Sequence, residues 1–167
     1  MDKYTNEPDE VMNDLNDLSS GDLIHHLLHN PNARVRLSAA IRLMKDLSTP
    51  VAIAYRSSLG DTSDMVVQLA CAELGHRGGE GNIEALFPVL NHNSWRVRLE
   101  ACKALITQGI TDHRITETIE ALSEDPEAAV YDTECDFFQE VIKEYGHGWP
   151  DKFWGKLNTI LSGPQPC

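Results

Sequence analysis

The chain repeats itself at an interval of 31 residues, and this period limits the possible folds more than any other feature. When the sequence is shifted by 31 residues against itself, leucine, valine and alanine return to the same places. A fixed period of this length means that each unit buries its apolar face only against its neighbours. The columns are Leu28, Leu59, Leu90 and, after a one-residue insertion, Leu122; Val35, Val66, Val97; Ala39, Ala70, Ala101; Ala40, Cys71, Cys102, Cys135; and Leu43, Leu74, Leu105, Phe138.

Each unit is predicted to consist of two antiparallel helices. Pro50 suits the first turn of a helix, and Gly109 is a natural stop at a helix end. Ser19 to Asp22 break a weak first helix over 8–18 and can cap the helix that carries Leu23. The expected first helices are 32–46, 63–75, 94–108 and 126–145, the expected second helices are 49–59, 82–90 and 112–123, and a final helix covers 150–161.

The domain organisation follows from the same pattern. Residues 9–162 are predicted to form a single domain, with a disordered N-terminal tail at 1–8 and a C-terminal tail at 163–167. A last unit that departs from the pattern is expected in a stack, because a terminal unit presents one face to water. Residues 76–81 are predicted to form a glycine-rich turn between two helices.

The net charge of −12 is unevenly distributed. Residues 1–22 hold seven acids and one base, residues 116–151 hold eleven acids and one base, and the middle of the chain is nearly neutral. Such a chain repels phosphate backbones at long range, so we expect no nucleic-acid partner. A basic protein partner fits these flanks better, although they also serve as a solvated surface that keeps the protein soluble.

No stretch of about 18 apolar residues occurs, so no membrane partner is expected. The polar, acidic start of the sequence lacks the basic and apolar segments of a secretory signal, which favours a cytoplasmic location.

Several segments resemble the short HEAT repeats named after phycobilisome lyases. Residues 32–40 and 94–102 are similar to the opening of the family's first helix, and residues 74–86 are similar to its helix–turn–helix junction. The resemblance covers about residues 20–145 and implies a right-handed α-α superhelix of about four HEAT-like helix pairs with terminal caps. It also implies that Arg36 and Arg98 brace neighbouring units, and that the second helices line the concave face.

Members of this family have many functions, and three of them require features that can be looked for in this sequence. Deoxyhypusine hydroxylases hold iron with His-Glu dipeptides, and none occurs here. HEAT-like DNA glycosylases use a basic groove, whereas this chain is acidic. Bilin lyases and chaperones bind a tetrapyrrole in the concave cleft, and no short motif decides for or against that role. A tetrapyrrole lyase or chaperone-like ligand-binding protein is therefore the alternative function.

Two groups of residues were considered for metal or thiol chemistry. His25 and His29 are four residues apart and share a helix face, so both could reach one metal ion, although they also lie where polar residues belong. Cys71, Cys102 and Cys135 share a column with Ala40 and are predicted to be small core residues rather than zinc ligands. No catalytic signature is present, so we expect no catalytic residue, resident metal or cofactor.

Candidate partner-binding residues lie in columns where the type of side chain differs from one unit to the next. Trp95 shares a column with Ala33 and Asp64, which suggests an exposed indole beside Arg96; alternatively, Trp95 folds over a neighbouring turn. Tyr55, Arg56 and Phe87 are predicted on the concave face, or else they fill the seam between helices. The sequence therefore predicts a non-catalytic scaffold or adaptor that binds a protein partner through Trp95, Arg96, Tyr55, Arg56 and Phe87.

Overall fold

The computed structural model describes residues 15–128, apart from the side chain of Ser123. Within this range the elements are helices joined by short turns, without a strand, which confirms the all-α prediction for this part of the chain. The elements are η1 (Leu15–Asp17), α2 (Ser20–His29), α3 (Ala33–Leu43), α4 (Thr49–Ser58), α5 (Asp64–Arg77), α6 (Glu80–Leu86), η2 (Phe87–Asn91), α7 (Trp95–Thr107) and α8 (His113–Glu124), of which η1 and η2 are 3-10 helices.

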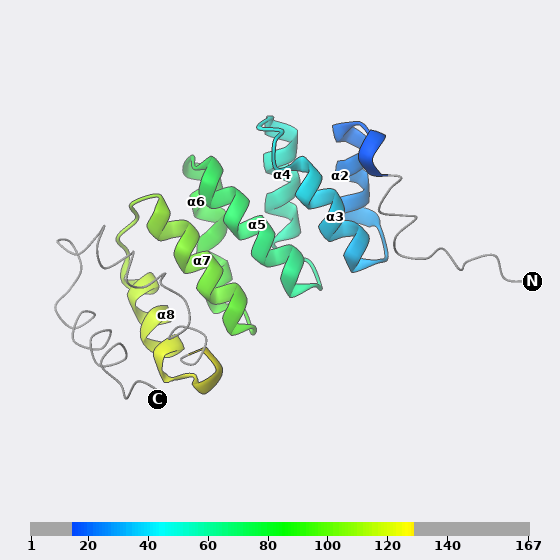
Figure 1. Cartoon of the computed structure of the whole chain (residues 1–167). Coiled ribbons are helices and arrows are strands. Elements are labelled where there is room, and N and C mark those ends of the chain that lie inside the picture. The colour runs from blue at the N-terminus through cyan, green and yellow to red at the C-terminus, as the bar shows by residue number, and fades with distance from the viewer. Residues whose placement is uncertain (1–14, 129–167) are drawn as a thin grey trace, which may run out of the picture.

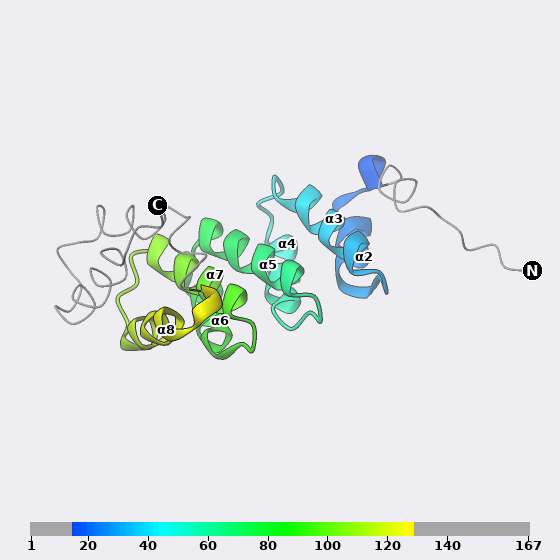
Figure 2. The ribbon, with the colours of Figure 1, turned by 60° about the horizontal axis from the view of Figure 1, so that its bottom comes forward.

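The helices form two rows that follow the chain order along the molecule (Figure 1). Helices α3, α5 and α7 form one row, here called the A row, in which each member packs on the next. Helices α2, α4, α6 with η2, and α8 form the B row. The rows also pack on each other, as the rotated view shows (Figure 2). The most extensive contacts between the rows join α2 with α3, α4 with α5, and η2 with α7, whereas α3 packs little on α4, the second helix expected in its own unit. Each of these helix pairs contacts mainly the pairs before and after it.

The spacing of the helices follows the sequence period. Helices α3, α5 and α7 begin at Ala33, Asp64 and Trp95, which are 31 residues apart, and α4 and α6 begin at Thr49 and Glu80 with the same interval. The period that was recognised in the side chains is thus also a period in the backbone.

Polar side chains fix several of these helix starts. The side chain of Asn32 accepts a hydrogen bond of 2.9 Å from the amide of Arg34, and Asp112 accepts one of the same length from the amide of Arg114. Ser19 accepts from the amide of Asp22 at 3.2 Å, as expected for the cap of α2. These bonds satisfy amides that have no partner inside the helix.

The repeated columns form the core. The valine and alanine columns of the A row are buried, and Cys71 and Cys102 are 0% exposed, which confirms that these two cysteines are core residues. In the first column, Leu90 and Leu122 are buried, whereas Leu28 and Leu59 are only partly buried. The buried positions include Val35, Val66, Val97, Ala39, Ala70, Ala101, Leu43, Leu74 and Leu105.

The turn after α5 is shorter than predicted. Helix α5 continues to Arg77, two residues beyond the expected end at Gly75, and only Gly78 and Gly79 separate it from α6. Both glycines have a positive φ, 61° and 88°, a conformation that other residues rarely adopt. Gly75 lies within this helix and against α7: a Cβ placed there would be 2.7 Å from the Cβ of Ala104.

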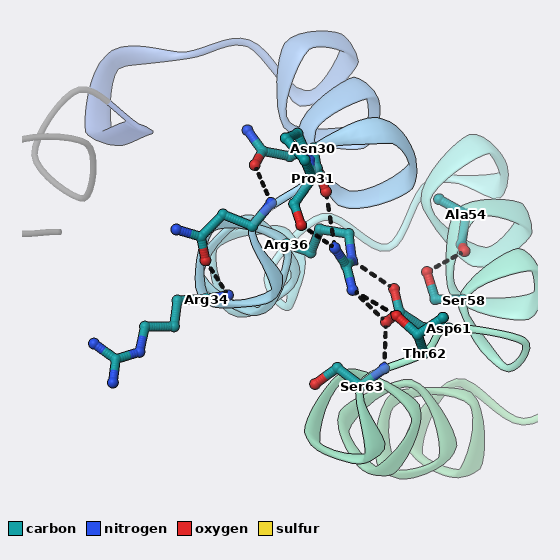
Figure 3. A network of polar contacts seen from close by, with 10 residues as sticks. Asn30, Pro31, Arg34, Arg36, Ala54, Ser58, Asp61, Thr62 and Ser63 are labelled. Atoms are coloured by element: carbon teal, nitrogen blue, oxygen red, sulfur yellow. Dashed lines mark hydrogen bonds and ion pairs between the residues drawn. The ribbon is translucent and has the colours of Figure 1, made fainter. Parts of the chain in front are cut away.

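A buried ion pair joins the first two helix pairs (Figure 3). Nε and Nη2 of Arg36 each donate a hydrogen bond of 2.7 Å to the carboxylate of Asp61, which lies in the loop before α5. Nη1 donates to the carbonyl oxygens of Asn30 and Pro31 at 2.8 and 3.2 Å. Asp61 also accepts from the amide of Ser63 at 2.7 Å. Arg36 therefore braces two neighbouring helix pairs, as expected.

Arg98 occupies the matching position on α7 and makes a related contact. Its Nη1 donates to the carbonyl oxygens of His92 and Asn93, at 2.7 and 3.0 Å. Both arginines thus hold the turn that leads into their own helix.

None of the helices within residues 15–128 has the length and apolar character needed to cross a lipid bilayer. Cys135, Cys167, the final helix at 150–161, the two predicted tails and nearly all of the helix expected at 126–145 lie outside the described residues.

Candidate functional site

Trp95, predicted as an exposed binding residue, lies buried. Only 7% of its surface is exposed, and its indole Nε1 donates a hydrogen bond of 3.1 Å to Oε2 of Glu127. The small Ala33 and the acidic Asp64 of the same column lie partly or fully exposed, because short side chains cannot reach the next turn. The indole is long enough to reach it. The expectation of an exposed indole is therefore wrong, and Trp95 folds over a neighbouring turn.

Arg96 stays at the surface beside this buried residue. Its guanidinium lies over the Trp95 ring, 4.4 Å from the ring centroid, and the side chain is exposed. Such stacking on an aromatic face is a favourable cation–π contact. Arg96 therefore covers the indole, and the two residues do not form an exposed pair.

Tyr55 also belongs to the core. It is 0% exposed, and its hydroxyl donates a hydrogen bond of 2.7 Å to the carbonyl oxygen of Ala40. Burial raises the pKa of the Tyr55 phenol well above its usual value. The prediction of Tyr55 as a surface residue is wrong; it fills the seam between α4 and the A row, which was the alternative.

Arg56 and Phe87 remain accessible on the B row. Both are half-buried, and Nη1 of Arg56 donates a hydrogen bond of 2.6 Å to Oδ1 of Asn82. The guanidinium of Arg114 lies over the Phe87 ring, 3.8 Å from its centroid. An aromatic ring and a cation are thus held together at the surface between η2 and α8.

The carboxylate of Asp112 fixes Arg114 over this ring. Nε and Nη2 of Arg114 donate to the two carboxylate oxygens at 2.8 and 2.9 Å. These hydrogen bonds hold the pKa of Asp112 well below its usual value and raise the pKa of Arg114. The guanidinium is therefore oriented before any partner arrives.

Two depressions flank the turn between η2 and α7. One, of about 510 Å³, lies beside Arg56 and the end of α4; the other, of about 480 Å³, lies beside Phe87 and Arg114. Both are lined by the turn residues Asn91, His92 and Asn93. We call this surface the B-row face; it consists of Arg56, Phe87, Asn91, His92, Asn93, Arg114 and Thr118.

His25 and His29 lie close together on α2, with ring centroids 4.9 Å apart, and both are exposed. No group of three or more histidine, cysteine, aspartate or glutamate residues suited to hold a metal ion occurs within residues 15–128. Two imidazoles alone fall short of the three or four protein ligands of a typical zinc site.

The two buried thiols are poorly suited to nucleophilic chemistry. Burial raises the pKa of Cys71 to about 12 and raises that of Cys102 as well. Since the thiolate is the reactive form, both side chains act as apolar core residues.

A second surface was missed by the sequence reasoning. It is a groove of about 830 Å³ at the ends of α3 and α5. The signal was available: Ile41, Met44 and Leu47 are apolar residues beside the core positions Ala40 and Leu43 but outside the repeated columns. We call it the Arg77 groove; its lining is Asn16, Ile41, Arg42, Met44, Lys45, Leu47, Glu73, His76 and Arg77.

Comparison with protein-family models and with curated proteins finds no match to this chain.

Proposed function

We propose that this protein is a non-catalytic interaction scaffold whose HEAT-like helix pairs form a right-handed superhelix and bind a protein partner through the B-row face. The regular interval between helix starts and the pairwise packing of the two rows support this architecture. Proteins of this kind offer an extended surface rather than an enclosed reaction site.

The observation that carries the proposal is the Phe87–Arg114 pair, which lines the depression of about 480 Å³. Aromatic and arginine side chains dominate the binding energy of many interfaces, especially next to pockets that a partner can fill. Asp112 orients Arg114 in advance, so less side-chain freedom is lost on binding. The acidic segments 1–22 and 116–151 favour a basic partner by long-range attraction.

The test is affinity capture from the protein's own source with the wild type and Arg114→Ala, followed by a titration of the identified partner. We expect Arg114→Ala and Phe87→Ala to weaken binding by about 2 kcal/mol or more, on the scale of interface hot spots. Thermal melts show whether Phe87→Ala remains folded.

Met65→Ala is the matched control, because Met65 is 62% exposed at the start of α5 and lies outside the B-row face. Its affinity should equal that of the wild type. Equal partner binding by Arg114→Ala, Phe87→Ala and the wild type would contradict the proposed use of this face.

A further inference from the structure

We propose that the Arg77 groove is a second docking site, which takes a peptide segment of another protein that presents aliphatic side chains next to a carboxylate. The groove lies at the ends of α3 and α5, whereas the B-row face lies between α4, η2 and α8. The inference therefore does not depend on the B-row face being used.

The first argument is the apolar lining. Ile41, Met44 and Leu47 are 51%, 40% and 79% exposed. They are three of the five large apolar side chains that are exposed within residues 15–128. Isolated apolar residues are common on surfaces, but several in one hollow mark a binding site. A volume of about 830 Å³ leaves room for more than one aliphatic side chain of a partner.

The second argument is the incomplete pairing of Arg77. Its side chain is 6% exposed, yet Nε and Nη1 have no hydrogen-bond partner within the part of the chain that the structure describes. Nη2 makes long contacts, 3.4 Å to the carbonyl oxygen of Leu43 and 3.6 Å to Glu73. The guanidinium also lies 5.0 Å from the centroid of the Tyr55 ring. Buried donors without acceptors are costly, so this guanidinium has capacity left for a carboxylate.

The geometry also indicates how a carboxylate would reach these donors. Nε and Nη1 are shielded from solvent, so the guanidinium must turn away from Tyr55 and into the groove. Its two polar contacts are long and therefore easily exchanged for short, charge-assisted bonds to a carboxylate. The flexible stem of an arginine permits this movement without a change in the helix.

The groove also carries more basic than acidic side chains. Lys45 and Arg77 line it, and Arg42 lies at its edge, bound to Asn16 and Ser38. Glu73 is the one acid among the lining residues and already contacts Arg77. Complementary charge steers partners and excludes wrong ones. An acidic, aliphatic segment fits this surface, and a basic segment does not.

The test uses full-length protein and fluorescence anisotropy with a synthetic probe. The probe is a 12-residue fluorescein-labelled peptide with three leucines on one helical face and glutamate at its other positions. One control peptide replaces each glutamate with lysine, and another replaces each leucine with serine. We expect saturable binding of the acidic leucine peptide and at least about tenfold weaker binding of both controls, the scale of lost anchor contacts.

Four variants locate the binding site. Leu47→Asp replaces an exposed apolar side chain with a negative charge, the same sign as the charge of the probe. It should weaken binding about tenfold without a change in melting temperature. Arg77→Met should weaken binding by a similar factor, whereas Arg77→Lys should retain part of it. Phe87→Ala, on the B-row face, should bind the probe as the wild type does.

Each of the following results would overturn the proposal: Leu47→Asp binds the probe as tightly as the wild type, the lysine peptide binds as tightly as the acidic peptide, or no saturable binding is measured. Self-association that Leu47→Asp abolishes would show that a second copy of the chain occupies the groove. Tighter binding by Val11→Asp/Met12→Asp would instead identify the chain's own acidic N-terminal segment as the occupant. None of these results concerns the Phe87–Arg114 pair, so the B-row proposal is tested separately.

Discussion

Arg36 and Arg77 are both buried arginines near helix ends, but their surroundings differ. The side chain of Arg36 is 11% exposed and that of Arg77 is 6% exposed. Arg36 binds both oxygens of Asp61 at 2.7 Å and two backbone carbonyls. Arg77 makes long polar contacts, and two of its donors are without an acceptor within residues 15–128.

This difference shows that burial alone does not reveal the role of a charged side chain. A guanidinium whose donors are all engaged holds parts of the fold together. Removing it leaves a buried carboxylate without its cation in an apolar environment. A guanidinium with unused donors contributes less to the fold and can still bind another group. Pairing geometry, rather than exposed area, separates the brace from the docking site.

The largest effect is expected for Arg36→Met. The substitution keeps an unbranched side chain but leaves Asp61 buried without its cation, which costs about 3–5 kcal/mol for a broken buried pair. Urea denaturation monitored by circular dichroism measures the change in the free energy of unfolding. Arg34→Met is the control, because Arg34 is exposed on the same helix. A loss in the free energy of unfolding no larger than that of the control would show that Arg36 does not brace the fold.

Arg98→Met should cost less than Arg36→Met. The described contacts of Arg98 are hydrogen bonds to the carbonyl oxygens of His92 and Asn93. Leaving these acceptors without a donor should cost about 1–3 kcal/mol. The same denaturation measurement applies, and equal losses for both variants would show that the carbonyl contacts, not Asp61, give Arg36 its importance.

Lowering the pH should weaken the Arg36–Asp61 ion pair gradually, and the loss of stability should be smaller than for the substitutions above. Burial opposes the ionisation of Asp61, but hydrogen bonds from Arg36 and the Ser63 amide outweigh it and lower the pKa of the carboxyl from 3.8. A depressed folded-state pKa stabilises the fold fully above the unfolded value and loses that contribution as the pH falls through the folded value. Denaturation midpoints of wild type and Asp61→Asn should therefore converge below about pH 4. A constant difference down to pH 2 would contradict the lowered pKa.

The smallest effect on stability is expected for Arg77→Met/Glu73→Gln. This pair of changes removes the under-paired cation and neutralises the buried Glu73, so no uncompensated charge remains. Replacing a poorly satisfied buried ion pair is often neutral or stabilising, so we expect a change within about 1 kcal/mol of the wild type. A loss as large as that of Arg36→Met, in the same denaturation assay, would make Arg77 a structural brace.

The spacing of the helices and the identity of the core could be predicted because both depend on the period alone. The column that Cys71 and Cys102 share predicts that they are core residues, and both are buried. Trp95 and Tyr55 were misjudged because a column describes the position of a Cβ, not where a long side chain ends. Trp95 reaches Glu127 on the next turn, a contact between segments that no single column contains.

The Arg77 groove could not be predicted because it depends on where two helices end. The first of these helices was expected to continue to Asp46, but α3 ends at Leu43. Met44 caps the end of α3, Leu47 follows outside the helix, and both lie exposed beside the end of α5. Conversely, α5 was expected to stop at Gly75, and its two additional residues, His76 and Arg77, line the groove.

The contact between Gly75 and α7 has a consequence for the history of this chain. A Cβ at position 75 would lie 2.7 Å from the Cβ and 2.8 Å from the Cα of Ala104. Even a change of Ala104 to glycine would leave the Cα in the way, so no partner substitution can make room for a larger residue. Sequence drift is therefore blocked at this one position as long as the two helices cross there. As long as α5 and α7 cross at this distance, position 75 accepts only glycine.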